Sequence, residues 1–155
     1  MRTKTAEWFE CKVQYEHIDA NGMNKKVKEL YAVDALSFSE SEGRIIDEMS
    51  QYINGDYEVI DIKKAKYKEI LFDERESADR WYKIKSQYIT LDEKTEKEKR
   101  QNVINLVQSD TIAGAIKTFD EFMSGTMIDY TVVEVKETLI LDVIEHKSKS
   151  DVEAV

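Results

Sequence analysis

Hydrophobic and polar residues alternate along two stretches of the chain, residues 7–18 and 80–91. Alternation with a period of two, in segments rich in β-branched and aromatic residues, is typical of strands that bury one face. Both stretches are therefore predicted to be strands. The same signals predict shorter strands at about 26–34 and 99–108, and strand regions at about 57–72 and 128–145. The length of the region at 57–72 indicates a bend or two strands.

Two other segments have the spacing of amphipathic helices. In the first, Ser37 and Glu40 fit a capping box, and Gly55 is the expected helix stop. Its predicted buried face consists of Phe38, Ile45, Ile46, Met49, Tyr52 and Ile53. The second helix is expected to start at Asp110 or Thr111 and to end at Gly125. Its predicted buried face consists of Ile112, Ile116, Phe119 and Met123.

The two halves of the chain resemble each other. WFECKVQY at residues 8–15 aligns with WYKIKSQY at 81–88, and YEVIDIK at 57–63 aligns with YTVVEVK at 130–136, both at an offset of 73 residues. The segment between these anchors aligns at an offset of 74, so one half carries a one-residue slip. Such self-similarity predicts a duplicated structural unit.

Each half is predicted to fold as β-β-α-β with a long last element. The expected fold class is therefore α+β, with tandem pseudo-twofold repeats, mostly antiparallel sheet and two helices on one side. The first repeat spans residues 1–77, the second spans 78–146, and a polar tail follows at 147–155. Because repeats of this size bury little surface alone, they are expected to pack as one globular domain. One continuous sheet and two separate sheets both fit this pattern.

Composition narrows the class of protein. The chain has 155 residues, 41% of them apolar, and a net charge of −9. A net acidic protein is a poor candidate for coating duplex DNA through bulk charge, although local basic stripes can still bind nucleic acid.

Cys11 is the only cysteine, which excludes an internal disulfide and a cysteine-based zinc site. We expect it to be a small buried hydrophobic residue. No signal peptide or transmembrane stretch is visible, which favours a cytoplasmic protein.

The repeated strands carry the candidate binding residues. Alternation places Trp8, Lys12 and Gln14 on the more polar face of the first strand. The aligned positions of the second half, on the matching face, are Trp81, Lys85 and Gln87. An aromatic ring, a cation and an amide on an open sheet face can bind single-stranded nucleic acid, because bases stack on the ring while lysine meets phosphate. Two alternatives stay open. One is structural: such tryptophans plug the end of a core or pack between two repeats, and the polar residues face solvent. The other is a surface that binds a protein partner.

Signals for catalysis, metals and cofactors are weak. The motif His17-x-Asp19 has a spacing too short to define a metal site, and the loop around Asn21-Gly22 lacks the carboxylates of a calcium loop. The chain has no glycine-rich phosphate loop and no nucleophile elbow. We therefore expect a protein that is not an enzyme, with no cofactor and no metal.

Segments along the whole chain, among them MRTKTAEWFECKVQYE, VDALSFSESEGRIIDEMS, ITLDEKTEKEKR and GTMIDYTVVEVKETLILDV, support a family resemblance. Up to about residue 146, the chain resembles an uncharacterised family of Bacteroides-type gut bacteria and their phages, including crAss-like phages. The resemblance implies a phage or mobile-element protein inside a bacterial host cell, encoded among genes of DNA metabolism. It supplies no catalytic residues.

Three functions fit these observations. The first is a binding protein of phage or mobile-element DNA metabolism that contacts single-stranded nucleic acid through the duplicated Trp/Lys/Gln face. The second is an accessory protein that binds and inhibits a host protein, such as a polymerase or a defence factor, where acidic charge favours a basic partner. The third is capture of a small nucleotide ligand between the repeats. A homodimer is also an expectation, since an exposed strand edge can pair with a second chain.

Overall fold

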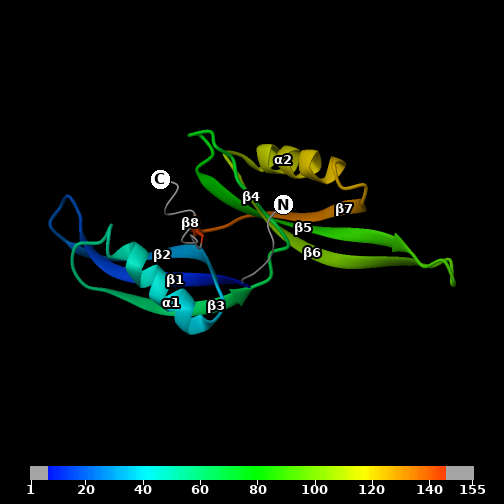
Figure 1. Cartoon of the computed structure of the whole chain (residues 1–155). Coiled ribbons are helices and arrows are strands. Elements are labelled where there is room, and N and C mark those ends of the chain that lie inside the picture. The colour runs from blue at the N-terminus through cyan, green and yellow to red at the C-terminus, as the bar shows by residue number, and fades with distance from the viewer. Residues whose placement is uncertain (1–6, 146–155) are drawn as a thin grey trace, which may run out of the picture. The chain divides into compact units, whose positions relative to one another are not determined.

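The computed structural model describes residues 7–145, which form eight strands and two helices (Figure 1). The predicted polar tail at 147–155 lies outside the described residues. The strands are β1 (Glu7–Ile18), β2 (Asn24–Ala35), β3 (Tyr57–Ala65), β4 (Ile70–Leu71), β5 (Arg80–Leu91), β6 (Glu98–Ser109), β7 (Asp129–Glu137) and β8 (Ile140–Ile144). The helices are α1 (Phe38–Met49) and α2 (Ile112–Ser124). The strands form two mostly antiparallel four-stranded sheets, so the predicted α+β class is confirmed.

The first compact unit contains the sheet with strand order β3-β1-β2-β8. Its long hairpin pairs β1 with β2 over their whole length, from Glu7 opposite Ala35 to Ile18 opposite Asn24. The hairpin turns at Gly22, whose φ of +79° is the left-handed conformation that the predicted Asn-Gly turn requires. The third strand, β3, lies antiparallel on the other side of β1 and forms one edge of the sheet.

Helix α1 covers the face of this sheet that carries the apolar half of β1. The core consists of Phe9, Cys11, Val13, Val33, Ala35, Ile45 and Met49. The helix starts at the predicted N-cap, where the Ser37 side chain accepts a hydrogen bond from the Glu40 backbone N–H. It ends at Met49 with Ser50 as C-cap, so the prediction of Gly55 as helix stop is wrong. Gly55, with a φ of +114°, instead turns the chain before β3.

The predicted buried face of α1 is too wide. Phe38, Ile46 and Tyr52 are 54%, 40% and 70% exposed, respectively. Only the stripe formed by Ser41, Ile45 and Met49 is fully buried, because a single sheet covers only one narrow side of a short helix. The other apolar residues around this helix stay partly exposed, although Phe38 still packs edge-to-face against Phe9 with ring centroids 4.9 Å apart.

The second compact unit contains the sheet with strand order β4-β6-β5-β7, which α2 covers. Its core consists of Tyr82, Ile84, Val107, Ala115, Phe119 and Met123. The predicted helix ends are confirmed, since Thr111 caps the start through Gly114 N–H and Gly125 is the C-cap. Ile112, which was predicted to be buried, is 52% exposed. Ala115 is buried in its place.

The compact units do not coincide with the sequence halves 1–77 and 78–146. Among the described residues, one unit contains 7–66 and 140–145, and the other contains Tyr67–Leu139. The predicted strand region at 57–72 divides into two strands, and the region at 128–145 does likewise. In each case the short second strand joins the sheet to which the first strand does not belong. There it pairs in parallel, β4 with β6 and β8 with β2. The strands thus form two sheets, while the duplication itself and a dyad between the halves stay predictions.

Candidate nucleic-acid interface

In the first unit, the predicted residues Trp8, Lys12 and Gln14 lie half-buried on the sheet face turned away from α1. Lys12 is directly opposite Asp61 of β3, and Gln14 is directly opposite Glu58. Directly opposed side chains share a face at about 5 Å between Cβ atoms, so each candidate faces a carboxylate. These carboxylates weaken the attraction of this face for phosphate.

In the second unit, Trp81, Lys85 and Gln87 likewise lie on the face turned away from the helix. Lys85 is opposite Ile104 of β6 and Glu134 of β7, and Gln87 is opposite Asn102 and Thr131. The structure therefore places each predicted triplet on one face of its own sheet.

Trp81 is buried, with 1% of its surface exposed. Its ring packs edge-to-face against Phe72, with ring centroids 5.5 Å apart. Its carbonyl oxygen accepts hydrogen bonds from the Thr138 backbone N–H at 2.9 Å and hydroxyl at 2.8 Å. A buried ring has no free face for a base, so the predicted stacking role does not fit Trp81, which is a packing residue here.

Gln87 belongs to an ordered polar network on the same face. Its Nε2 donates to Oδ1 of Asn102 at 3.1 Å, and its Oε1 accepts from the Arg100 guanidinium at 3.3 Å. Arg100 also donates to a carboxylate oxygen of Glu98 at 3.1 Å. The network aligns a cation with two amides on the exposed half of the β5–β6 hairpin.

The two sheet faces differ in charge over matching spans. In the first unit, the matching face consists of the even-numbered residues of Glu10–Glu16 and their direct partners in β2 and β3. Its cations and its carboxylates are equal in number: Lys12, Lys26, Lys28 and Lys63 against Glu10, Glu16, Glu58 and Asp61. In the second unit we define the basic sheet face as the odd-numbered residues of Lys83–Ile89 and their direct partners in β6 and β7. Its cations, Lys83, Lys85, Arg100 and Lys136, outnumber its carboxylates, Asp129 and Glu134, and they still do when Glu98, which lies just beyond the span and pairs with Arg100, is counted. A local positive excess thus exists within an acidic chain.

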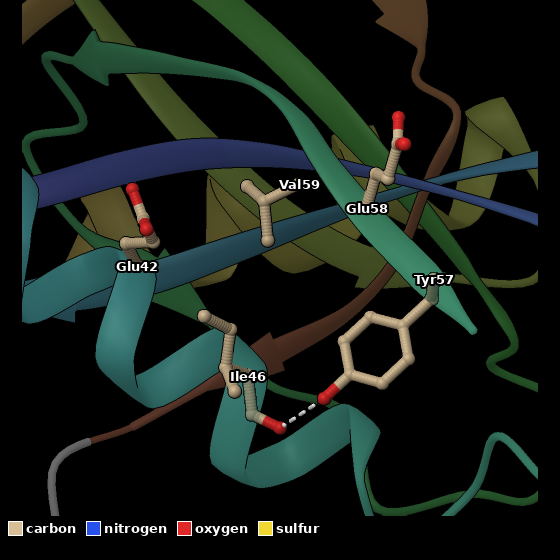
Figure 2. Close-up of a pocket in the computed structure, with 5 residues that line it drawn as sticks. All are labelled: Glu42, Ile46, Tyr57, Glu58 and Val59. Carbon is tan, nitrogen blue, oxygen red and sulfur yellow. Dashed lines mark hydrogen bonds between the residues drawn. The ribbon is translucent and has the colours of Figure 1, made fainter. Parts of the chain in front are cut away.

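A groove between α1 and the edge strand β3 was not predicted. It has a volume of about 480 Å³ and is lined by Glu42, Ile46, Tyr57, Glu58 and Val59. Figure 2 shows Ile46 and Val59 pointing toward each other across it, and the Tyr57 hydroxyl bonded to the Ile46 carbonyl. The pattern Tyr57-Glu58-Val59 indicates a strand. The position of that strand at a sheet edge depends on how the other strands pair, which this pattern does not specify.

Several groups have shifted pKa values. Burial raises the pKa of the Cys11 thiol to about 11. A hydrogen bond to Asp120 raises the pKa of Tyr130 to about 12. Burial and a hydrogen bond to Glu29 raise the pKa of Tyr31, and the same carboxylate raises that of Tyr15. These groups hold their protons at neutral pH, so none of them is an activated nucleophile or base.

Residues 7–145 contain no group of three His, Cys, Asp or Glu side chains placed to hold a metal ion. Neither of the described helices has the length and apolar character needed to cross a membrane.

Comparison with known proteins identifies the family. Residues 7–146 match the model of a domain of unknown function, DUF4494, and the chain belongs to that family. No functionally curated protein matches the chain.

Proposed function

We propose that this member of the DUF4494 family is a non-enzymatic binding protein, and that its basic sheet face binds single-stranded nucleic acid. The observation that carries the proposal is the positive excess on that face, where Lys85 and Arg100 stand within a chain of net charge −9. Sequence-independent binding to nucleic acid is dominated by contacts between cations and phosphates. The matched face of the first unit has balanced charges, so we assign the contact to the second unit.

Each group on the basic sheet face has a role in this proposal. Lys85 and Arg100, which lie four positions apart along the β5–β6 ladder, meet separate phosphates. The amides of Gln87 and Asn102 offer donors and acceptors to base edges. Ile104, which is 37% exposed, supplies an apolar contact in place of the aromatic ring that Trp81 does not provide.

The biological setting belongs to the same proposal. A role in phage or mobile-element DNA metabolism, in the cytoplasm of a bacterial host cell, rests on the family resemblance of the sequence. In that setting, single strands are exposed during replication and recombination, and a small binding protein would protect or deliver them.

The test is a titration of a labelled oligothymidylate of about 16 nucleotides, followed by fluorescence anisotropy at low salt. We expect saturable binding with a Kd of about 1–100 μM that weakens steeply as salt rises. The double variant Lys85→Glu, Arg100→Glu should bind at least about tenfold more weakly and should lower the salt slope by about 0.7 per lost phosphate contact.

The matched control is Lys12→Glu, Lys26→Glu, which makes the same charge change at the aligned positions of the first unit. This control changes net charge equally but leaves the basic sheet face intact, so its affinity should fall far less. Absence of saturable binding at low salt, or equal losses in the two double variants, would contradict the proposal.

A further inference from the structure

We infer a second binding site, independent of the basic sheet face: the groove between α1 and β3 takes an extended, basic segment of a partner protein as an added strand. The groove is lined on one side by Glu42 and Ile46, one helical turn apart in α1, and on the other by Tyr57, Glu58 and Val59 of β3.

The lining residues show that the groove reaches the edge of the strand. Side chains alternate between faces along β3, so a hollow over one face of the sheet would touch only every second residue. Tyr57, Glu58 and Val59 are consecutive, and all three line the groove. It therefore opens along the side of β3, where the strand order β3-β1-β2-β8 leaves an edge of the sheet.

An edge strand offers backbone groups for pairing with another chain. Peptides that add a strand to a sheet gain affinity from main-chain hydrogen bonds and specificity from pockets for alternate side chains. Here the pocket for alternate side chains is the space between β3 and α1. The hydrogen bond of 2.9 Å from the Tyr57 hydroxyl to the Ile46 carbonyl holds the helix and the strand at this separation (Figure 2).

The chemistry of the lining selects the occupant. Toward α1, a partner side chain would contact Ile46, which is 40% exposed, and Val59, so this position favours an aliphatic residue. Glu58 is an exposed carboxylate on the opposite face of β3 from Val59, and Figure 2 shows it pointing away from Ile46, so it favours Lys or Arg at the neighbouring positions of the partner strand. Glu42 is an exposed carboxylate that borders the groove on the α1 side. The segment that fits alternates β-branched apolar residues with lysine or arginine.

A second copy of this chain fits the groove less well. If two copies paired through β3, the middle of each strand would lie at the centre of the new interface. The middle of β3 is irregular, because its register with β1 shifts there and Ile60 is left without a partner in β1. Bulges of this kind disrupt strand pairing at sheet edges. The groove lies beside Tyr57–Val59, before the shift, where a short heterologous strand can pair without crossing it.

The probe is a labelled synthetic peptide of about seven residues that alternates valine and lysine, titrated at physiological ionic strength. A scrambled peptide of the same composition, with its lysines and valines in separate blocks, retains the charge but loses the alternation. We expect the alternating peptide to bind at least about tenfold more tightly, since only it presents one apolar side to Ile46 and Val59.

Charge reversal locates the site. Glu58→Lys, on the side that the peptide lysines face, should weaken binding of the alternating peptide by about tenfold, and Glu42→Lys, on the α1 side, should weaken it less. Glu134→Lys is the matched control, because it makes the same charge change on β7, the edge strand of the other sheet, and it should leave affinity nearly unchanged. Thermal melts of all three variants show whether each remains folded.

Three results would overturn the inference. The first is equal binding of the alternating and scrambled peptides, and the second is an equal loss in Glu134→Lys. The third is a dimer in sedimentation experiments that Glu58→Lys dissociates, because a second copy would then occupy the edge. None of these outcomes bears on the oligonucleotide titration, which depends on the other sheet.

Discussion

The hydroxyl of Tyr57 lies 2.9 Å from the carbonyl oxygen of Ile46 and donates a hydrogen bond to it, joining the edge strand β3 to helix α1. The same carbonyl also accepts a hydrogen bond of 3.0 Å from the backbone N–H of Ser50, the C-cap, so it receives two hydrogen bonds at the end of the helix. Both bonded residues line the groove beside β3, so the bond links local stability to the shape of a candidate binding site.

Replacing Tyr57 by phenylalanine removes this bond and keeps the ring. The expected result is a loss of about 1 kcal/mol in the free energy of unfolding, the usual net value of one hydrogen bond. Urea unfolding measures it. Phe122→Tyr, at a surface position that is 37% exposed, controls for the exchange of the two ring types and should have little effect. Unchanged stability in Tyr57→Phe would mean that the bond contributes nothing in solution.

The two helical glycines should respond oppositely to alanine. At Gly43 in α1, an added Cβ meets no heavy atom within 4 Å, so Gly43→Ala should raise the free energy of unfolding by about 0.5–1 kcal/mol. At Gly114 in α2, the new Cβ would lie 2.5 Å from Oγ of the buried Ser109. Gly114→Ala should therefore show no gain or a net loss. Thermal melts of both variants check the contrast, and equal stabilisation would contradict it.

Cys11 should be unreactive in the folded protein. Burial raises the pKa of its thiol to about 11 from an ordinary value of 9.0, so the folded state holds the proton more tightly than the unfolded state. The stability from the neutral thiol is fully present below pH 9.0 and is lost as the pH rises toward about 11. A chromogenic disulfide at pH 8 should label the thiol only in denaturant, and rapid labelling of native protein would refute the assignment.

The two tryptophans should contribute unequally to stability. Trp81 is 1% exposed and packs against Phe72, so Trp81→Ala should cost about 3–5 kcal/mol. Trp8 is half-buried on its sheet, and Trp8→Ala should cost less. Chemical denaturation of both variants measures the difference. A greater loss of stability for Trp8→Ala than for Trp81→Ala would contradict the assignment of Trp81 as the more buried ring.

Local signals predicted the elements well. The alternation at 7–18 and 80–91 gives the bounds of β1 and β5, and Thr111 and Gly125 mark the ends of α2, because strand faces and helix caps depend on neighbouring residues. The strand partners of β4 and β8 were not predictable, since an apolar run does not specify which sheet edge it joins.

The candidate site was predicted only in part. Lys85 and Gln87 lie on the expected face, but Trp8 and Trp81, which share the same local pattern, differ in burial. Burial of Trp81 depends on Phe72, which the sequence pattern does not connect to it. The charge difference between the two sheet faces likewise follows from cross-strand register, as with Arg100 opposite Ile89. Sequence alone could not give these contacts, since they join residues far apart in the chain.

The most direct test of the central claim is a map of amide chemical-shift changes in ¹⁵N-labelled protein as oligothymidylate is added. Binding of single strands by the basic sheet face should make the shifts cluster at Lys85, Gln87, Arg100, Asn102 and Lys136 and saturate together. Shifts confined to β1, α1 and β3, or no shifts at low salt, would contradict it.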